Sequence, residues 1–208
     1  MICRFIKRAR PAIVVGALFL GFANGAAAAG DPDRGRVLAS TCGGCHAIPG
    51  YRNAYPSFRV PMLGGQHPEY IVLALQAYKA RQRPHQTMQA QAASLSDQDM
   101  QDIAAYFANL GEAKTGPAVT SGDVGRGREK ASTCVACHGE TGISLTNQWP
   151  NLAGQHESYL ERTLVQYKSG LRQDVVMGGL VLTLTPQDMK DLAAYYAAQP
   201  GMFTATRD

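Results

Sequence analysis

Cys42-Gly43-Gly44-Cys45-His46 is the stretch around which the chain is organised, and its pattern returns later as Cys134-Val135-Ala136-Cys137-His138. Two cysteines at positions i and i+3 lie on one face of a helical turn, so both thiols can add to the two vinyl groups along one haem edge. The histidine that follows then lies under the iron, where its imidazole is a strong ligand. Each copy therefore predicts a covalently bound haem together with its first axial ligand.

Two other chemistries use a Cys-x-x-Cys pair, and both explain the sequence less well. A zinc site needs four ligands, but no further Cys-x-x-Cys and no spaced histidine pair follows either copy. A thioredoxin-like redox centre needs a strand before the pair and has no use for a histidine directly after it. Haem attachment explains both copies, and the cysteines predicted to form the thioether bonds are Cys42, Cys45, Cys134 and Cys137.

Residues 1–29 have the organisation of a cleaved secretory signal peptide. A basic start is followed by an apolar run over 12–23 and by small residues suited to cleavage at 26–29. The apolar run is short for a membrane span, and an uncleaved anchor is the alternative. Covalent haem attachment of this type takes place outside the cytoplasm in bacteria, so leader and motifs both predict a periplasmic protein.

The charge and the cysteine content agree with that interpretation. The chain has 20 Lys and Arg against 16 Asp and Glu, and the basic residues of the leader account for its formal net charge of +4. A balanced remainder argues against nucleic-acid binding, which needs a basic face. One of the five cysteines, Cys3, lies in the leader and the other four lie in the motifs, so none is left for a structural disulfide.

Beyond the leader, the chain is an internal repeat. Leu63-Gly64-Gly65-Gln66-His67 matches Leu152-Ala153-Gly154-Gln155-His156. Each half has the size of one small domain, which would be marginal with an apolar core alone and for which a haem would supply the missing interior. The predicted division is a first domain over 30–110, a linker of glycine, proline and small residues over 111–121, and a second domain over 122–208, with a loosely held end over 200–208.

Each half repeats the same helices, and no convincing alternating strand pattern occurs, so the predicted fold class is all-α. A helix leads into each haem motif, over about 32–44 and 124–136. A second follows each Gly-Gln-His segment, with apolar residues at helical spacing. The last begins at Ser96 in the first half and at Thr185 in the second, where a hydroxyl suits the N-cap.

The repeat also selects the second iron ligand. Met88 and Met177 lie at the same point of the loop that is expected before the final helix. Met100 and Met189 pair as well, but they lie on the apolar stripe of that helix, where core filling is expected. A methionine sulfur favours ferrous iron and raises the reduction potential. The predicted ligands are therefore His46 and Met88 in the first half and His138 and Met177 in the second.

Other side chains leave alternatives open. His67 and His156 also pair, so a bis-histidine haem is the rival to methionine ligation, although a cap or a backbone contact is expected for them. His85 is unpaired and is expected to face solvent or a haem propionate. The residues expected to line the haem pocket are Pro61, Leu63, Trp149 and Pro150.

Basic residues follow the middle helix at matching places in the two halves. They are Lys79, Arg81 and Arg83 in the first half and Lys168 and Arg172 in the second. We expect a solvated helix end that complements the helix dipole. Contact with haem propionates or with the acidic patch of a partner is the alternative.

These motifs together resemble the diheme class I c-type cytochromes of the cytochrome c4 family. The shared features are Cys-x-x-Cys-His, Leu-x-Gly-Gln, a methionine before Leu-Ser or Leu-Thr, and a final Ala-Ala-Tyr at 104–106 and 193–195. The resemblance implies two tandem class I cytochrome c domains related by pseudo-twofold symmetry, with haem edges that meet at the domain interface. It also implies two covalently bound haem c groups with His/Met ligation. One departure is Ala47, which stands where the second half has Gly139.

The resemblance implies an electron carrier and not an enzyme. Its donor would be a quinol-oxidising cytochrome complex and its acceptor a terminal oxidase or reductase, with small and transient docking. Peripheral association with the outer face of the inner membrane is compatible with this function. The alternative is a diheme cytochrome subunit of a dehydrogenase, such as a flavoprotein complex that oxidises sulfide. A peroxidase is a third class, and it would need an open or exchangeable iron site.

Overall fold

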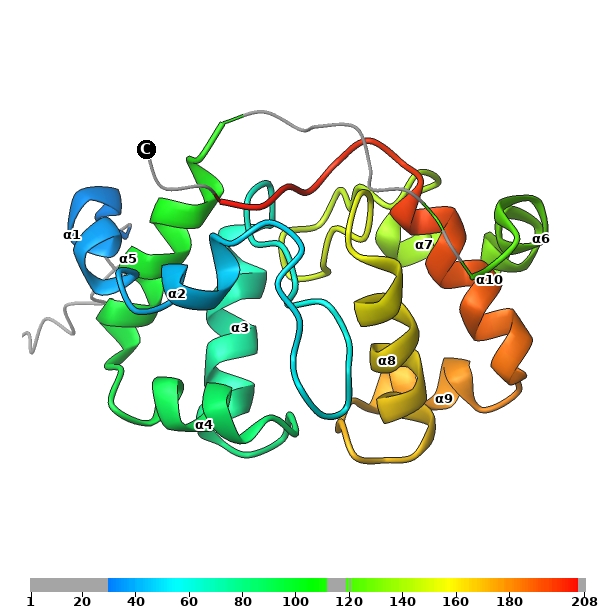
Figure 1. The fold of residues 1–208 in the computed structure, drawn as a ribbon, viewed down its shortest axis with the longest axis horizontal. Helices are drawn as coiled ribbons and strands as arrows, with labels where there is room; N and C mark the ends of the chain where they lie inside the picture. Colours follow the sequence, from blue (N-terminus) through cyan, green and yellow to red (C-terminus); the bar gives the residue numbers. More distant parts are fainter. Residues whose placement is uncertain (1–29, 112–118, 120, 206–208) are drawn as a thin grey trace, which may run out of the picture.

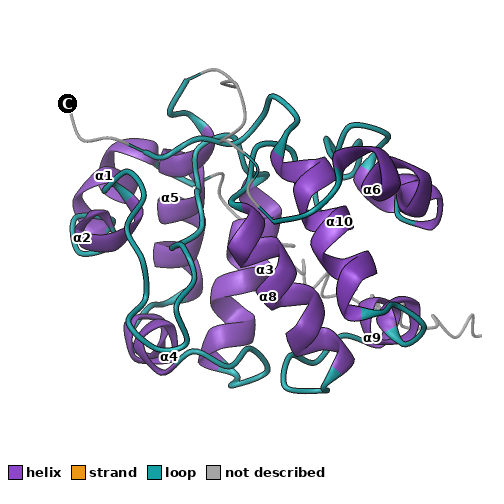
Figure 2. Cartoon of the chain, turned by 45° about the vertical axis from the view of Figure 1, so that its right-hand side comes forward, coloured by secondary structure: helices purple, strands orange, loops and turns teal. Residues whose placement is uncertain are grey.

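The computed structural model describes residues 30–111, 119 and 121–205, and the regular structure in these residues is helical (Figure 1). The predicted leader over 1–29, most of the predicted linker over 111–121 and the chain end at 206–208 lie outside the described residues. Within them, β pairing is limited to two isolated bridges, Arg52 with Arg59 and Gly64 with Phe203. Figure 2 accordingly shows helices and loops alone, so the all-α prediction is confirmed.

The helices form two groups that follow the repeat. The first half contains α1 (Pro32–Leu38), α2 (Gly43–His46), α3 (Pro68–Lys79), α4 (Gln86–Ala93) and α5 (Asp97–Ala108). The second half contains α6 (Val124–Lys130), the 3-10 turn η1 (Ala131–Thr133), α7 (Val135–His138), α8 (Glu157–Lys168), α9 (Val175–Val181) and α10 (Pro186–Ala197). No helix in the described part of the chain is both long enough and apolar enough to cross a membrane.

The last helix of each half is its centre. Helix α5 packs against α1 and α3, and α10 packs against α6 and α8. At the first crossing, a Cβ added to Gly35 would meet the backbone carbonyl of Asp102, so only glycine allows the helices to come so close. Gly127 makes the same approach to Asp191 in the second half.

A buried aspartate ties the first helix of each half to the last. Asp102 accepts a hydrogen bond from the backbone nitrogen of Asp31 at 2.8 Å and pairs with Arg34. Asp191 accepts from the backbone nitrogen of Asp123 at 2.8 Å and from Nε of Arg126 at 2.8 Å. The carboxylate therefore satisfies a backbone donor at the helix start that would otherwise lack a partner.

The core positions predicted for Met100 and Met189 are confirmed, and the predicted first helices need correction. Met100 and Met189 are buried in the two cores, as the apolar stripe predicted. The helix expected over 32–44 is broken into α1 and α2, and the one expected over 124–136 into α6, η1 and α7. The break arises because backbone nitrogens there bond three residues back, as Ser40 does to Val37 at 3.2 Å, which tightens the turn.

The end of the chain is held firmly, so the prediction of a loose end is wrong over its described part. Met202, Phe203 and Ala205 are buried. The chain runs from α10 back across the first half (Figure 1), where Phe203 and Gly64 exchange backbone hydrogen bonds of 3.1 and 3.2 Å. The ring of Phe203 lies directly over Gly64, where a Cβ would collide with it.

The halves meet through reciprocal contacts. Arg83 donates to the hydroxyl of Tyr159 at 2.9 Å, and Arg172 donates to the hydroxyl of Tyr70 at 2.9 Å. Since these residues occupy equivalent places in the repeat, the contacts relate the two halves by the predicted pseudo-twofold symmetry. The solvated helix end expected for Arg83 and Arg172 is therefore wrong, because both guanidinium groups are buried in the interface.

Candidate functional site

A cavity of about 630 Å³ crosses the interface between the halves and reaches both haem motifs. Helices α2 and α7 bring the motif cysteines and histidines to its wall, and α4 and α9 bring the methionines. All eight predicted site residues line it, namely Cys42, Cys45, His46, Met88, Cys134, Cys137, His138 and Met177. The structure thus gathers residues that are far apart in sequence around one space.

Both motif histidines are oriented by a proline carbonyl. Nδ1 of His46 lies 2.8 Å from the carbonyl oxygen of Pro61, and Nδ1 of His138 lies 3.0 Å from that of Pro150. A carbonyl can only accept, so Nδ1 must carry the proton and Nε2 keeps its lone pair. Burial lowers the pKa of both imidazoles, which favours the neutral form that binds a metal.

The four motif cysteines are free and partly buried. Burial raises the pKa of the Cys42 and Cys134 thiols. None of the four thiols is used in a disulfide, so each Cys-x-x-Cys pair is available for thioether bonds to the two vinyl groups of a haem.

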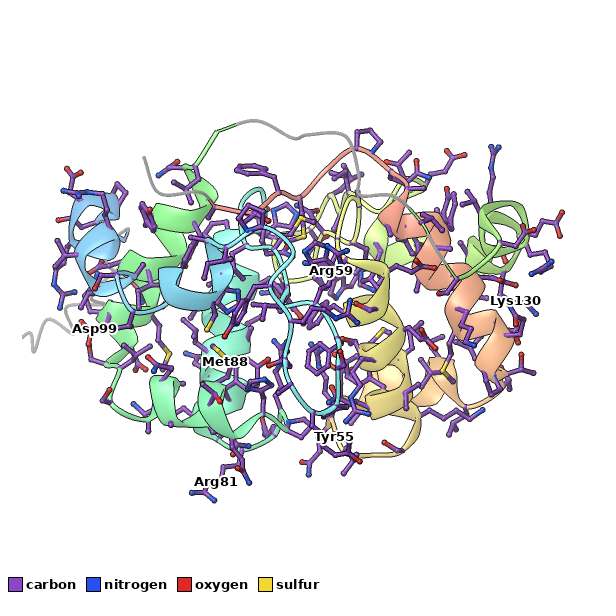
Figure 3. All side chains as sticks on the ribbon, viewed as in Figure 1. Tyr55, Arg59, Arg81, Met88, Asp99 and Lys130 are labelled. Carbon is purple, nitrogen blue, oxygen red and sulfur yellow. The ribbon has the colours of Figure 1, made fainter. Side chains whose placement is uncertain are left out.

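The methionines lie in short helices, so the prediction that placed them in a loop is wrong. Met88 is the third residue of α4 and Met177 the third of α9. Each helix is capped by the side chain three residues earlier: Nδ1 of His85 accepts from the backbone nitrogen of Met88 at 3.2 Å, and Asp174 accepts from that of Met177 at 2.8 Å. Figure 3 labels Met88 on α4, which lies below α2 in that view.

These capping residues were missed as functional residues. The usable pattern was a polar side chain three residues before each paired methionine, which suits an N-cap. His85 is half-buried and lines the cavity, and its Nε2 lies 3.1 Å from Oδ1 of Asn53. Its contact with a haem propionate stays a prediction.

The paired histidines of the Gly-Gln-His segments do not line the cavity. Nε2 of His67 lies 3.0 Å from the carbonyl oxygen of Ser144. His156 is buried, and its Nδ1 has no hydrogen-bond partner. Both stand at the N-cap position of a helix without a side-chain cap bond. The expected backbone contact is therefore confirmed for His67, whereas a capping role is wrong for both. Their positions favour methionine over a bis-histidine haem.

The remaining lining combines predicted and unpredicted residues. Pro61, Leu63, Trp149 and Pro150 line the cavity, as predicted. Arg83 and Arg172 line it as well, and each guanidinium lies over a tyrosine ring, 4.4 Å from the centroid of Tyr78 and 4.5 Å from that of Tyr167. The tyrosines that precede both arginines at matching places were the sequence pattern that could have revealed these pairs.

The donor set fits an iron porphyrin better than a bare metal ion. In each half the cavity wall offers two thiols, an imidazole with a free Nε2 and a methionine sulfur. Within the described residues, no group of three or more His, Cys, Asp or Glu side chains could hold a metal ion by itself. A porphyrin would supply the remaining ligands of an iron that the imidazole and the methionine sulfur of each half could hold.

Comparisons with known proteins agree with this geometry. A family model described as cytochrome c matches residues 32–111 and 124–198. Cytochrome c4 from Pseudomonas aeruginosa is 33% identical over 191 residues, covering 86% of this chain and 93% of the relative.

Two solved structures are similar along both halves. The cytochrome c4 structure from Acidithiobacillus ferrooxidans has a TM-score of 0.68 and 29% identity, and covers 77% of this chain and 99% of that one. A thiosulfate dehydrogenase structure from Marichromatium purpuratum has a TM-score of 0.70 and 31% identity, and covers 81% of this chain and 40% of that one.

Proposed function

This chain belongs to the cytochrome c family, and from that membership we propose that it is a periplasmic carrier between a quinol-oxidising cytochrome complex and a terminal oxidase or reductase. As a diheme protein of the cytochrome c4 type, it binds two haem c groups covalently and transfers electrons. The donor, the acceptor, the compartment and the role of each residue below are parts of the proposal.

The proposed ligands follow from the cavity wall. In the first half, Cys42 and Cys45 form the thioether bonds, and His46 and Met88 bind the iron. In the second half, these roles belong to Cys134, Cys137, His138 and Met177. When bound, each haem supplies one-electron exchange between ferrous and ferric iron. The methionine sulfur favours the ferrous state, and the carbonyl on Nδ1 of each histidine keeps Nε2 directed to the metal.

The single observation that carries the proposal is the continuous cavity. Both cysteine pairs and both methionines line the same space across the interface, so two redox groups held there lie within one protein interior. A methionine sulfur bound to each iron together with the histidine would leave no open site for oxygen or peroxide. The arrangement therefore supports a relay, with the side chains holding the groups and excluding water.

The surface around the methionine helix supports contact with redox partners at the second half. Val175 and Val176 on α9 are 94% and 63% exposed, whereas Gln86 and Thr87 stand at the equivalent places on α4. Val176 also lines the cavity. A redox partner that buries these apolar side chains would approach the second haem closely, and an apolar contact region is typical of the centre of protein interfaces.

A second candidate is a permanent cytochrome subunit of a dehydrogenase. The similarity to the thiosulfate dehydrogenase structure favours it. This chain matches 40% of that longer chain, which is what one cytochrome part of a larger dehydrogenase would match. In such an assembly the cavity and its ligands would serve the same electron transfer, but with a fixed partner.

Purification of the holoprotein from its native host tests both. For the carrier we expect a protein that elutes alone, takes up two electrons reversibly, and does not bind carbon monoxide in the ferrous state. Stoichiometric co-elution with a dehydrogenase would establish the second candidate. Prompt peroxide turnover or carbon monoxide binding would overturn the carrier function, because both need an open iron site.

A further inference from the structure

Two buried glutamines reach across the interface and bind the backbone of the opposite half. Gln155 accepts from the backbone nitrogen of Met62 at 3.0 Å and donates to its carbonyl oxygen at 3.0 Å. Gln66 accepts from the backbone nitrogen of Asn151 at 2.9 Å and donates to its carbonyl oxygen at 3.0 Å. Met62 and Asn151 occupy equivalent places in the repeat. The glutamine of each half therefore binds the equivalent backbone residue of the opposite half, and we call each such contact a clamp.

The clamped residues directly follow the prolines that orient the motif histidines. Met62 follows Pro61, whose carbonyl oxygen lies 2.8 Å from Nδ1 of His46. Asn151 follows Pro150, whose carbonyl oxygen lies 3.0 Å from Nδ1 of His138. The backbone atoms fixed by each glutamine therefore belong to the peptide segment that presents the proline carbonyl to the histidine of the other half.

We propose that Gln66 and Gln155 are crossed positioning residues: the glutamine of each half holds the proline carbonyl that tunes the histidine ligand of the other half. This inference rests on the proposed function, in which His46 and His138 bind iron. It goes beyond that function because it makes the potential of each haem depend on a residue of the opposite half.

The direction of the effect follows from ligand basicity. A hydrogen bond from Nδ1 to a carbonyl raises the basicity of the imidazole, and a more basic ligand favours ferric iron. Loss of the clamp lets the carbonyl move away from Nδ1, which weakens that bond. The potential of the haem in the opposite half should therefore rise.

The two glutamines differ in how much each contributes to holding the segment that it binds. The side chain of Asn151 is itself anchored, because its Nδ2 donates to the carbonyl of Gly65 at 2.9 Å and its Oδ1 accepts from the backbone nitrogen of Ser144 at 2.9 Å. Met62 has no amide with which to form such bonds. We therefore expect the larger effect from loss of Gln155, which holds the segment of Met62.

The test compares the holoprotein with Gln66→Met and Gln155→Met, which keep an unbranched side chain but remove the paired hydrogen bonds. Both midpoint potentials are measured by redox titration, with each haem assigned by NMR contacts to its own half. We expect Gln155→Met to raise the potential of the His46 haem and Gln66→Met to raise that of the His138 haem. The change should be on the order of tenfold in the ferrous-to-ferric ratio at fixed potential, which is about 59 mV for one electron.

A second readout separates positioning from direct contact, since both glutamines line the cavity. The NMR signal of the Nδ1 proton of His46 should shift with Gln155→Met and not with Gln66→Met, and that of His138 should do the reverse. A contact between glutamine and haem alone would leave these protons unmoved and would overturn the proposal.

Controls cover general loosening of the interface and failure to fold. Ser158→Ala removes another bond between the halves, from the backbone nitrogen of Arg59 to Ser158 at 3.0 Å, and should move neither potential. If a methionine variant does not fold, Gln155→Asn and Gln66→Asn keep the amide but shorten its reach, and should give the same crossed pattern. Equal shifts of both haems, or a shift confined to the mutated half, would overturn the proposal. A wild-type spectrum without histidine ligation would instead defeat the ligand assignment.

Discussion

At the scale of the residue, the proposal that Met88 and Met177 bind iron assigns the choice of redox chemistry in each half to a methionine sulfur. Met88 is half-buried against the core of the first half, and its backbone nitrogen is fixed by the His85 cap. Met177 is fixed in the same way by Asp174. The caps differ chemically but place the sulfur at the same turn of a short helix. The position of each methionine at the cavity wall therefore depends on a local hydrogen bond between its backbone nitrogen and the capping side chain.

Replacement of either methionine should change one haem and spare the other. Met88→Ala is expected to abolish the far-red sulfur-to-iron absorption band of the first haem and to lower its potential, because sulfur no longer stabilises ferrous iron. Met177→Ala should do the same for the second haem. Visible spectroscopy with redox titration measures both changes.

The matched control is Met100→Ala, since Met100 is fully buried in the core. It should cost about 2–5 kcal/mol of stability and keep both sulfur-to-iron bands. Unchanged bands in Met88→Ala or Met177→Ala would show that the ligand is another group.

His156 should make stability depend on pH. Burial, with the nearby cations Arg59 and Arg52, lowers the pKa of His156 to about 4. An unfolded histidine titrates near pH ~6.5, so the unfolded state binds the proton more readily. This contribution to stability is complete above about pH 6.5 and is lost as the pH falls toward 4. Urea unfolding between pH 7.5 and 4.5 should show a smaller decrease for His156→Gln than for the wild type, and parallel curves would contradict the prediction.

At the scale of the element, α4 and α9 explain both what the sequence reveals and what it hides. The haem motifs and the repeat were enough to predict the eight proposed site residues, all of which line the cavity. The helices around the methionines escaped, because α4 has small and polar residues on every side and so lacks an apolar stripe at helical spacing. Both α4 and α9 begin at a side-chain cap, His85 in one and Asp174 in the other. A cap is a short-range pattern that the periodicity of apolar residues does not detect.

The exposed faces of these two helices give a matched pair of surface variants. Val175→Lys on α9 should slow electron exchange with redox partners by roughly tenfold, because a charge replaces an apolar contact at the interface centre. Gln86→Lys, at the equivalent place on α4, should leave the rate unchanged. Both side chains are exposed, so folding should be almost unaffected.

Stopped-flow reduction of the purified holoprotein by quinol-supplied native membranes measures these rates. Repeating it over a range of ionic strengths separates apolar contact from charge steering. Equal slowing by the two variants would argue against docking at the second half.

At the scale of the whole molecule, the interface is the part that the sequence did not predict. Arg83 and Arg172 follow helices and therefore predicted solvated ends, but each guanidinium is buried between a tyrosine of its own half and one of the other. Such contacts are set by how two domains dock. A repeat predicts that the halves are alike, yet it does not say which of their faces meet.

The chain end should couple the halves, and Phe203 provides the test. Its ring packs on Gly64 of the first half, so Phe203→Ala removes buried apolar surface and should cost about 3–5 kcal/mol of stability. The single tryptophan, Trp149, lies in the second half, whereas far-UV circular dichroism reports on the helices of both halves. Guanidinium unfolding of the wild type should give coincident transitions by the two probes, as expected of one cooperative unit.

In Phe203→Ala the circular dichroism transition should begin before the tryptophan transition, because the first half loses its cover while the second keeps its own core. The neighbouring Thr204→Ala should behave like the wild type. Coincident transitions at the wild-type midpoint in Phe203→Ala would show that the interface side chains hold the halves together without a contribution from the end of the chain.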